Sequence, residues 1–301
     1  MEINFIKYRK IYFAFSGILI VLSSVALFVF GLNLGIDFKG GSILELEYKG
    51  FRPSNQEIER SLSGLDLGTI SVQSTGGKGV IIRTKEISEE THQAVLQGLG
   101  QGFEFQELRF ESIGPAIGRE LTQKTQYLIL FSLIAILIYI ALAFGRIQRP
   151  MQSWQYGLVT SLVALFHDVL IPFGVFSVLG YLYGTQITIP IIAAFLTVLG
   201  YSVNDTVVIF DRIRENLLKK EGFSFGETVN KSLNQVLIRS INISLTSILV
   251  LLAIFFWGGS TLKDFSLALM IGITAGTYSS IFIAAHLMVS WALWRERMRR
   301  T

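Results

Sequence analysis

The stretch LGYSVNDTVVIFDRIREN, from Leu199 to Asn216, places Asn204 and Asp205 inside an otherwise apolar run. The run is long enough to cross a membrane, and a carboxylate at the centre of such a helix costs roughly 2.5–3.5 kcal/mol on insertion scales. A residue kept at that cost needs a polar partner and usually has a function. This stretch therefore predicts a membrane protein with an ionisable site inside its bundle of helices.

The composition of the chain also predicts a membrane protein. Hydrophobic residues make up 51% of the 301 residues and charged residues 16%, and the mean hydropathy is +0.52, unlike an ordinary soluble domain. The absence of cysteine excludes disulfides and thiolate metal sites. The net charge of +4 comes from basic residues at the ends of apolar runs, so we expect no nucleic-acid partner.

Six apolar runs are long enough to span a bilayer core of about 30 Å. A signal peptide is the competing interpretation of the first run, but the run is too long and no small-residue cleavage site separates it from a mature domain. The predicted spans are Ile11–Ile36, Thr125–Gly145, Ser153–Leu179, Thr185–Phe210, Ser240–Leu262 and Phe265–Trp294. A capping box at Ser224–Glu227 predicts a helix over Phe225–Val236 that enters the fifth span.

Basic residues predict the orientation of the spans, since cytoplasmic loops carry the excess of Lys and Arg. One side holds nearly all of them: Lys7, Arg9, Lys10, Arg146, Arg149, Arg212, Arg214, Lys219, Lys220, Lys231, Arg295, Arg297, Arg299 and Arg300. The short loops on the other side contribute only Lys263. We therefore expect a multi-pass protein of the cytoplasmic (inner) membrane with both termini in the cytoplasm. The predicted parts are 1–32, an external domain 33–124, a bundle 125–294 with a cytoplasmic loop 211–236, and a basic tail 295–301.

The external segment 33–124 has the pattern of an α+β domain in the order β-α-β-β-α-β, a split, ferredoxin-like unit. Alternating residues, a capping box at Ser54–Glu57 and a glycine-rich hairpin at Gly76–Gly79 predict its elements: strands at Ile43–Tyr48, Thr69–Ser74, Val80–Lys85 and Phe103–Ser112, and helices at 55–63 and 88–99. The segment has no nucleotide fingerprint, HExxH motif or Ser-His-Asp arrangement. We expect no cofactor, no metal site and no catalytic reaction, and we place the lone His92 on a helix surface.

Four ionisable residues lie within the predicted spans: His167, Asp168, Asp205 and Arg239. Asp205 lies about one and a half to two turns from the cytoplasmic flank of its span, and Arg239 begins the next span from the same side. A guanidinium at similar depth can hold the carboxylate through two parallel hydrogen bonds. Desolvation offsets much of that attraction, so an entering proton or ion could break the pair. A static salt bridge that fixes helix packing is the other interpretation.

The remaining polar residues of the spans have packing interpretations. Adjacent helical residues point about 100° apart, so His167 and Asp168 are not expected to form one bidentate site. A structural hydrogen bond to another span and a relay role both stay open for them. We expect His286 to pack or snorkel rather than conduct. A stripe for close helix approach is predicted at Gly272, Gly276 and Ser280. Side chains that can hydrogen-bond across helices are Asn204, Thr206, Asn242, Ser244, Thr246 and Ser247.

Five motifs in this order resemble those of the SecD/SecF family of protein-export membrane proteins, within the RND transporter superfamily. They are GIDFKGG at Gly35–Gly41, IGPAIGREL at Ile113–Leu121, the pair His167–Asp168, Leu199–Asn216, and SLNQVLIRS at Ser232–Ser240. The single positions that carry the resemblance include Gly35, Asp37, Gly40, Gly41, Gly114, Pro115, Gly118, Asp211 and Arg212. The layout is similar to an RND half-transporter, with one span, an exported domain and five further spans. His286 departs from the family, in which proline is common there.

The resemblance implies a function and partners. It implies a transmembrane ion path with the ion-coupling residues Asp205, Arg239, Asn204, Asp168, His167 and Thr206. It implies that the exported domain helps a preprotein chain leave the Sec channel (SecY, SecE and SecG), driven by a proton or sodium gradient instead of a nucleotide. RND-type transporters pair two six-span bundles, so a SecD-like subunit is expected to complete a heterodimer. The choice between H⁺ and Na⁺ depends on geometry.

Three other functions are consistent with parts of this pattern. An assembly factor of the translocon without ion coupling would need Asp205 only for structure. A small-molecule or lipid exporter of the same superfamily would need an apolar pocket, for which the short external domain has little room. An intramembrane aspartyl protease would use Asp168 and Asp205, but the Gly-x-Gly-Asp signature is missing. Arg239 is also placed to keep Asp205 ionised, whereas a protease dyad shares a proton.

Overall fold

The computed structural model describes residues 3–145, 154–219 and 224–298. The chain forms two compact units. One is a helical bundle of Met1–Leu32, Ile129–Thr185 and Pro190–Thr301, and the other contains Asn33–Leu128 together with Gln186–Ile189. The sequence did not predict that the short segment 186–189 belongs with the second unit.

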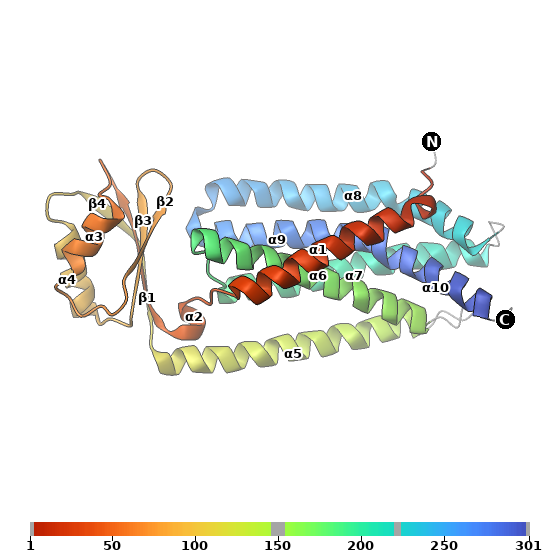
Figure 1. Ribbon diagram of the computed structural model, residues 1–301, viewed down its shortest axis with the longest axis horizontal. Coiled ribbons are helices and arrows are strands. Elements are labelled where there is room, and N and C mark those ends of the chain that lie inside the picture. The colour runs from red at the N-terminus through yellow and green to blue at the C-terminus, as the bar shows by residue number, and fades with distance from the viewer. Residues whose placement is uncertain (1–2, 146–153, 220–223, 299–301) are drawn as a thin grey trace. The chain divides into compact units, whose positions relative to one another are not determined.

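Among the described residues, six helical segments are long and apolar enough to cross a membrane, as predicted. They are α1 (Arg9–Phe30), α5 (Pro115–Gly145), α6 (Trp154–Tyr183), α7 (Ile189–Leu218), α8 (Phe225–Trp257) and a last segment made of α9 (Gly259–Ser279), the π-helix η2 (Ser280–Ala284) and α10 (Ala285–Met298). A 3₁₀ turn, η1 (Ile6–Tyr8), precedes α1. The start of α1 and the end of α10 lie at the same end of the bundle (Figure 1).

Several ends of the spans differ from the prediction. The first helix ends at Phe30 instead of Ile36, because Gly31 adopts a φ of 67° that breaks the helix, and Ile36 starts the short helix α2 (Ile36–Lys39). Helix α7 continues to Leu218, so the first part of the predicted loop 211–236 is helical. The predicted helix from Phe225 is confirmed: Ser224 caps it, and it runs without a break into the fifth span.

Some residues used to predict the orientation lie outside the described part of the chain. They are Arg146, Arg149, Lys220, Arg299 and Arg300.

Small residues bring the helices of the bundle close together. A Cβ atom added at Gly272 would lie 2.2 Å from Val198 Cγ2, and one added at Gly276 would lie 3.0 Å from Ser202 Cβ. The predicted close-approach stripe is therefore confirmed, and its partner is α7. Between α1 and α6, a Cβ atom at Gly174 would lie 2.4 Å from the Cβ of Ser23. Such contacts supply the packing that replaces a hydrophobic driving force in lipid.

The second unit confirms the predicted order β-α-β-β-α-β. Its elements are β1 (Gly41–Tyr48), α3 (Asn55–Leu62), β2 (Ser71–Thr75), β3 (Gly79–Thr84), α4 (Glu89–Leu99) and β4 (Phe105–Ile113). The strands form one antiparallel sheet in the order β2-β3-β1-β4, and both helices cover the same face of it (Figure 1). The core lies between the sheet and these two helices and contains Leu44, Leu46, Tyr48, Ile58, Leu62, Val95 and Leu99.

The prediction of a surface His92 is wrong. The side chain is only 4% exposed, and its ring stacks on Phe110 of β4 with centroids 3.7 Å apart and planes 3° apart. His92 shares a helix face with Val95 and Leu99, at spacings of three and four residues, and that face meets the sheet. His92 Nδ1 also lies 3.2 Å from the carboxylate of Glu89, so the ring keeps a polar partner while its faces pack.

We expect Gly174→Ala to destabilise the bundle, because the new methyl group would also lie 2.5 Å from the backbone Cα of Ser23, which cannot move aside like a side-chain tip. Overpacking of this kind costs about 1–3 kcal/mol. The midpoint of thermal unfolding of the purified protein should fall. Gly17→Ala, on the partner helix α1 with no atom within 4 Å of the added Cβ, is the matched control and should not lower it.

The capping box of α3 should make the stability of the first turn of this helix depend on pH. Hydrogen bonds from the backbone N–H and the hydroxyl of Ser54 lower the pKa of Glu57, so its charged form stabilises the folded helix above the unfolded pKa. That stability is lost as the pH falls below about 4 and through the folded pKa. Hydrogen-exchange protection of the first turn should drop over this range. The drop should vanish in Glu57→Gln and persist in Glu59→Gln; an unchanged drop in Glu57→Gln would contradict the assignment.

Candidate functional site

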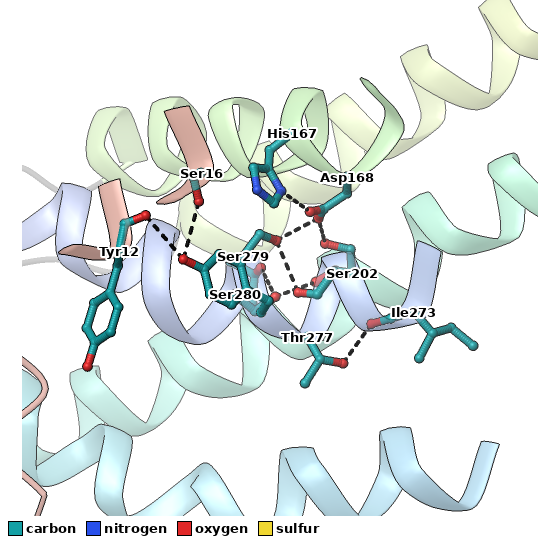
Figure 2. A network of polar contacts seen from close by, with 12 residues as sticks. Tyr12, Ser16, His167, Asp168, Ser202, Ile273, Thr277, Ser279 and Ser280 are labelled. Carbon is teal, nitrogen blue, oxygen red and sulfur yellow. Dashed lines mark hydrogen bonds and ion pairs between the residues drawn. The ribbon is translucent and has the colours of Figure 1, made fainter. Parts of the chain in front are cut away.

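A buried carboxylate joins three of the spanning helices. Asp168 on α6 has no exposed surface (0%). His167 Nδ1 lies 2.9 Å from Asp168 Oδ1, and the hydroxyls of Ser202 on α7 and Ser279 on α9 donate to Asp168 Oδ2, the latter at 2.7 Å. Figure 2 shows these side chains converging on the carboxylate. Both oxygens of Asp168 therefore have partners, as a polar group away from water requires.

The π-helix extends this network along α7. Ser280, its first residue, has Oγ 2.9 Å from Thr206 Oγ1 and donates to the carbonyl of Ser202 at 3.3 Å. Single π-helical turns are rare and frequently occur at functional sites. Because Thr206 follows Asp205 directly in α7, the hydroxyl network leads from Asp168 to the residue beside the second carboxylate.

The carboxylate of Asp205 has partners on one oxygen only. Ser240 on α8 donates to Asp205 Oδ1 at 2.7 Å, whereas Oδ2 is buried and accepts no hydrogen bond from the described residues. A buried carboxylate oxygen without a partner is costly. Oδ2 is therefore the atom at which a proton or a cation would be stabilising.

Further hydroxyls continue from Ser240 between α7, α8 and α9. Ser244 Oγ donates to the Ser240 carbonyl at 3.0 Å, and it lies 2.5 Å from Thr277 Oγ1 and 3.0 Å from the hydroxyl of Tyr201. Hydroxyl groups can both donate and accept hydrogen bonds, so such a chain can reorient when a neighbouring group changes its charge. The arrangement can support the transfer of a proton or the solvation of a small cation.

The predicted ion pair between Asp205 and Arg239 is not formed. Arg239 is exposed, and within the described chain no hydrogen bond or ion pair involves its side chain. Adjacent residues point about 100° apart on a helix. Because Ser240 faces Asp205, Arg239 points to the outside of the bundle, and Asn204, the neighbour of Asp205, is exposed in the same way.

The two histidines of the spans are buried. Asp168 accepts hydrogen bonds from two other spans, which is one of the two interpretations that the sequence left open. The contact between neighbouring His167 and Asp168 was not predicted. His167 also stacks beside Tyr278, with centroids 5.9 Å apart. His286 is 0% exposed and lies edge-on to Tyr12 at 5.2 Å. Packing of His286 is confirmed, and snorkelling is wrong because the side chain faces the bundle interior.

Several hydroxyls of the site were missed from the sequence. Ser202, Ser240 and Ser279 were not selected, and Ser280 was predicted only as a packing residue. The available signal was that serine in an apolar span usually hydrogen-bonds across helices. Adjacent hydroxyls at 279 and 280 are conspicuous in such a span, but sequence does not tell which helix they face.

Two of the predicted family motifs pack against each other in the second unit. Gly40 has a φ of 77° and Gly41 a φ of 124°, conformations that favour glycine. A Cβ atom at Gly40 would lie 3.3 Å from Pro115 Cα, and one at Gly118 would lie 3.1 Å from the backbone nitrogen of Gly40. Gly114 approaches Glu86, since a Cβ atom there would lie 2.8 Å from its Oε1. The glycines thus allow backbone contact where the chain leaves and re-enters the spans.

The first motif also binds the segment before α7. Asp37 Oδ2 accepts a hydrogen bond from the N–H of Ile189 at 2.9 Å, a favourable position for a carboxylate at a helix N-terminus. Gly35 donates to the carbonyl of Ile187 at 2.8 Å. These bonds explain why residues 186–189 belong to the second unit.

The motif residues Asp211 and Arg212 lie near the surface of α7, and Arg212 joins α7 to α8. Arg212 Nε donates to Gln235 Oε1 at 2.7 Å, and its guanidinium pairs with Glu215. Asp211 pairs with Arg214 at 3.2 Å. Neither residue belongs to the buried networks. Among the described residues, no group of three His, Cys, Asp or Glu side chains could hold a metal ion.

Comparisons with known proteins identify relatives over nearly the whole chain. Residues 91–294 match the model of "Protein export membrane protein SecD/SecF, C-terminal", and residues 25–50 match the "SecD/SecF GG Motif". The chain is 40% identical to the protein translocase subunit SecF of Thermobaculum terrenum, over 96% of this chain and 94% of the relative. It is 41% identical to that of Rhodothermus marinus, over 95% and 92%.

A solved structure is similar as well. The crystal structure of SecDF from Thermus thermophilus, a translocon-associated membrane protein, matches 97% of this chain with a TM-score of 0.84 and 34% identity. This chain covers 39% of that longer chain.

The buried bonds to Asp168 should stabilise the bundle measurably. We expect Ser202→Ala to lower the free energy of unfolding by about 1.5–3 kcal/mol, as for a hydrogen bond to a charged group. Ser247→Ala is the matched control, because that hydroxyl donates only to Ile243 of its own helix. Denaturant unfolding of the purified protein measures both. An equal loss of unfolding free energy in the two variants would show that the hydrogen bond from Ser202 to Asp168 does not stabilise the bundle.

Proposed function

Because this chain belongs to the SecD/SecF family of protein-export membrane proteins, we propose that it is a subunit of the Sec apparatus that uses an ion gradient to promote late-stage preprotein translocation. The observation that carries the ion coupling is the carboxylate of Asp205. Ser240 donates to its Oδ1, and its buried Oδ2 has no partner among the described residues. A proton or Na⁺ arriving at Oδ2 removes the cost of the unpaired oxygen. The buried hydroxyls around it provide the route by which the change reaches α8 and α9.

Asp168 has a different part in this proposal. Its two oxygens already have three partners, so it positions α6, α7 and the start of the π-helix and keeps Thr206 in place beside Asp205. No hydrogen bond joins Asp168 to Asp205 in the described part of the chain, although an aspartyl protease dyad shares a proton between its carboxylates. The contacts therefore favour a coupling site over a proteolytic one.

The exposed polar residues support a second subunit. Arg239 and Asn204 are exposed on the outside of α8 and α7, and a charged side chain that faces lipid is costly. A SecD-like bundle placed over this face would supply partners for both. In the assembled state we propose that the Sec channel and the preprotein contact the external domain.

We propose that both termini are cytoplasmic and that the domain 33–124 lies on the external side. The described residues contain an even number of candidate spans, and the first and last helices have their outer ends at the same end of the bundle (Figure 1). Both observations support termini on the same side of the membrane. The basic residues support the cytoplasmic assignment.

Export of a secreted precursor into inverted membrane vesicles, with the SecD-like partner present, tests the coupling. Asp205→Asn should lose the part of export that depends on the ion gradient and keep the rest, because an amide cannot gain or lose the proton. Asp66→Asn is the control; its carboxylate is exposed on the external domain and pairs with Lys85. Comparison requires equal assembly of the variants. Full gradient-dependent export by Asp205→Asn would contradict the proposal and leave a purely structural subunit.

A further inference from the structure

A pocket of about 560 Å³ lies between the N-terminal segment and the start of α8, away from the buried carboxylates. Its lining includes the four cationic side chains Lys7, Arg9, Lys10 and Lys231, and one carboxylate, Glu227. The pocket therefore has a strong positive charge at the end of the bundle where α1 begins.

Among the described residues, three of these four cations lack the ion pairs that other basic residues of this end form. The basic residues of α7 form the ion pairs Arg212–Glu215, Arg214–Asp211 and Lys219–Glu215. By contrast, Lys7, Arg9 and Lys10 form no ion pair with any residue that the structure describes. Glu227 accepts a hydrogen bond from the hydroxyl of Ser224 at 2.9 Å. The pocket thus has an excess of positive charge for which an anion from outside the chain is a suitable partner.

The wall of the pocket is held in place by two asparagines one turn apart on α8. Asn230 Oδ1 accepts from the N–H of Phe5 at 2.8 Å, and Asn234 Oδ1 accepts from the N–H of Ile3 at 2.9 Å. Both amide groups also donate to the carbonyl of Ile3, and the ring of Phe5 is buried in the bundle core. A preformed wall reduces the entropy lost when a ligand binds.

The pocket lies at the level expected for lipid headgroups. The apolar part of α1 runs from Ile11 to Phe30, which covers a core of about 30 Å and places Arg9 and Lys10 at its boundary. Counting back from Trp257 on α8 puts Lys231 roughly 10 Å outside the same boundary. The headgroup layer lies within this interval.

We propose that this pocket binds the phosphate headgroup of an anionic phospholipid. Arg9 can offer two parallel N–H groups to phosphate oxygens, while the lysines act as point charges. The acyl chains would lie along the exposed apolar side of α1. Ile11, which is 62% exposed, is the first residue of that side. Because Ser224 already caps the N–H of Glu227, the side chains bind the anion, not the helix end. Free phosphate shares the headgroup chemistry but lacks the apolar part.

Native mass spectrometry of the full-length protein tests the site, with titrations of phosphatidylglycerol, phosphatidylcholine and inorganic phosphate. Each cation near an anionic lipid surface contributes about fivefold in affinity. The double variant Arg9→Gln/Lys10→Gln should therefore bind phosphatidylglycerol about 25-fold more weakly. Lys124→Gln/Lys263→Gln removes the same charge outside the pocket and should bind like the wild type.

Three outcomes would overturn the proposal. These are equal losses in both double variants, equal binding of phosphatidylcholine and phosphatidylglycerol, or displacement of the lipid by inorganic phosphate at similar concentration. Photoreactive phosphatidylglycerol added to the wild-type protein gives an independent test that needs no stable variant. It should label the peptides containing residues 4–10 and 224–231, and labelling confined to other peptides would overturn the site.

Discussion

The hydrogen bonds to the Asp168 carboxylate are the interaction on which the bundle depends. In lipid no hydrophobic force drives helices together, so close packing and polar contacts must do so. Both operate at the same place. Gly276 has no side chain, so α9 packs closely against Ser202 of α7; a Cβ atom added at Gly276 would lie only 3.0 Å from the Cβ of Ser202. That approach brings the hydroxyls of Ser202 and Ser279 to one carboxylate oxygen. The glycine stripe and the buried charge are therefore two parts of one constraint.

The two carboxylates differ in their hydrogen-bond partners, and this difference suits Asp168 to a structural role and Asp205 to the proposed ion coupling. Asp168 is enclosed on α6 with partners on both oxygens, so a change in its charge would break three contacts at once. Within the part of the chain that the structure describes, Asp205 has a hydrogen bond on one oxygen and no partner on the other, so a cation or proton at the second oxygen breaks no existing bond. A site that must load and unload an ion in each cycle needs the second arrangement, supported by the rigidity of the first.

Sequence predicted the elements of this protein better than the directions of its side chains. Apolar runs, alternation at Ile43–Tyr48 and the cap at Ser54 are local signals, and they located the spans and the β-α-β-β-α-β unit. The face that α8 turns toward the bundle is not determined by neighbouring residues in the sequence. It depends on the contacts of Ser240 and Ser244 with α7 and α9, and these contacts leave Arg239 on the outside. His92 was misplaced for a similar reason, because its partner Phe110 is on a distant strand. The π-helix has no sequence signal comparable to a cap.

The outward position of Arg239 can be explained by a second bundle of helices that this chain does not contain. A guanidinium keeps its charge in proteins, so the cost of exposing it at the edge of the apolar layer cannot be removed by losing a proton. A partner at the same depth would remove this cost. Asp205, the carboxylate that the sequence predicted as the partner of Arg239, accepts a hydrogen bond from Ser240 instead. The matching solved chain is more than twice as long, which leaves room for a second bundle. Under the proposed pairing with a second bundle, Arg239 lies in the interface between the two bundles.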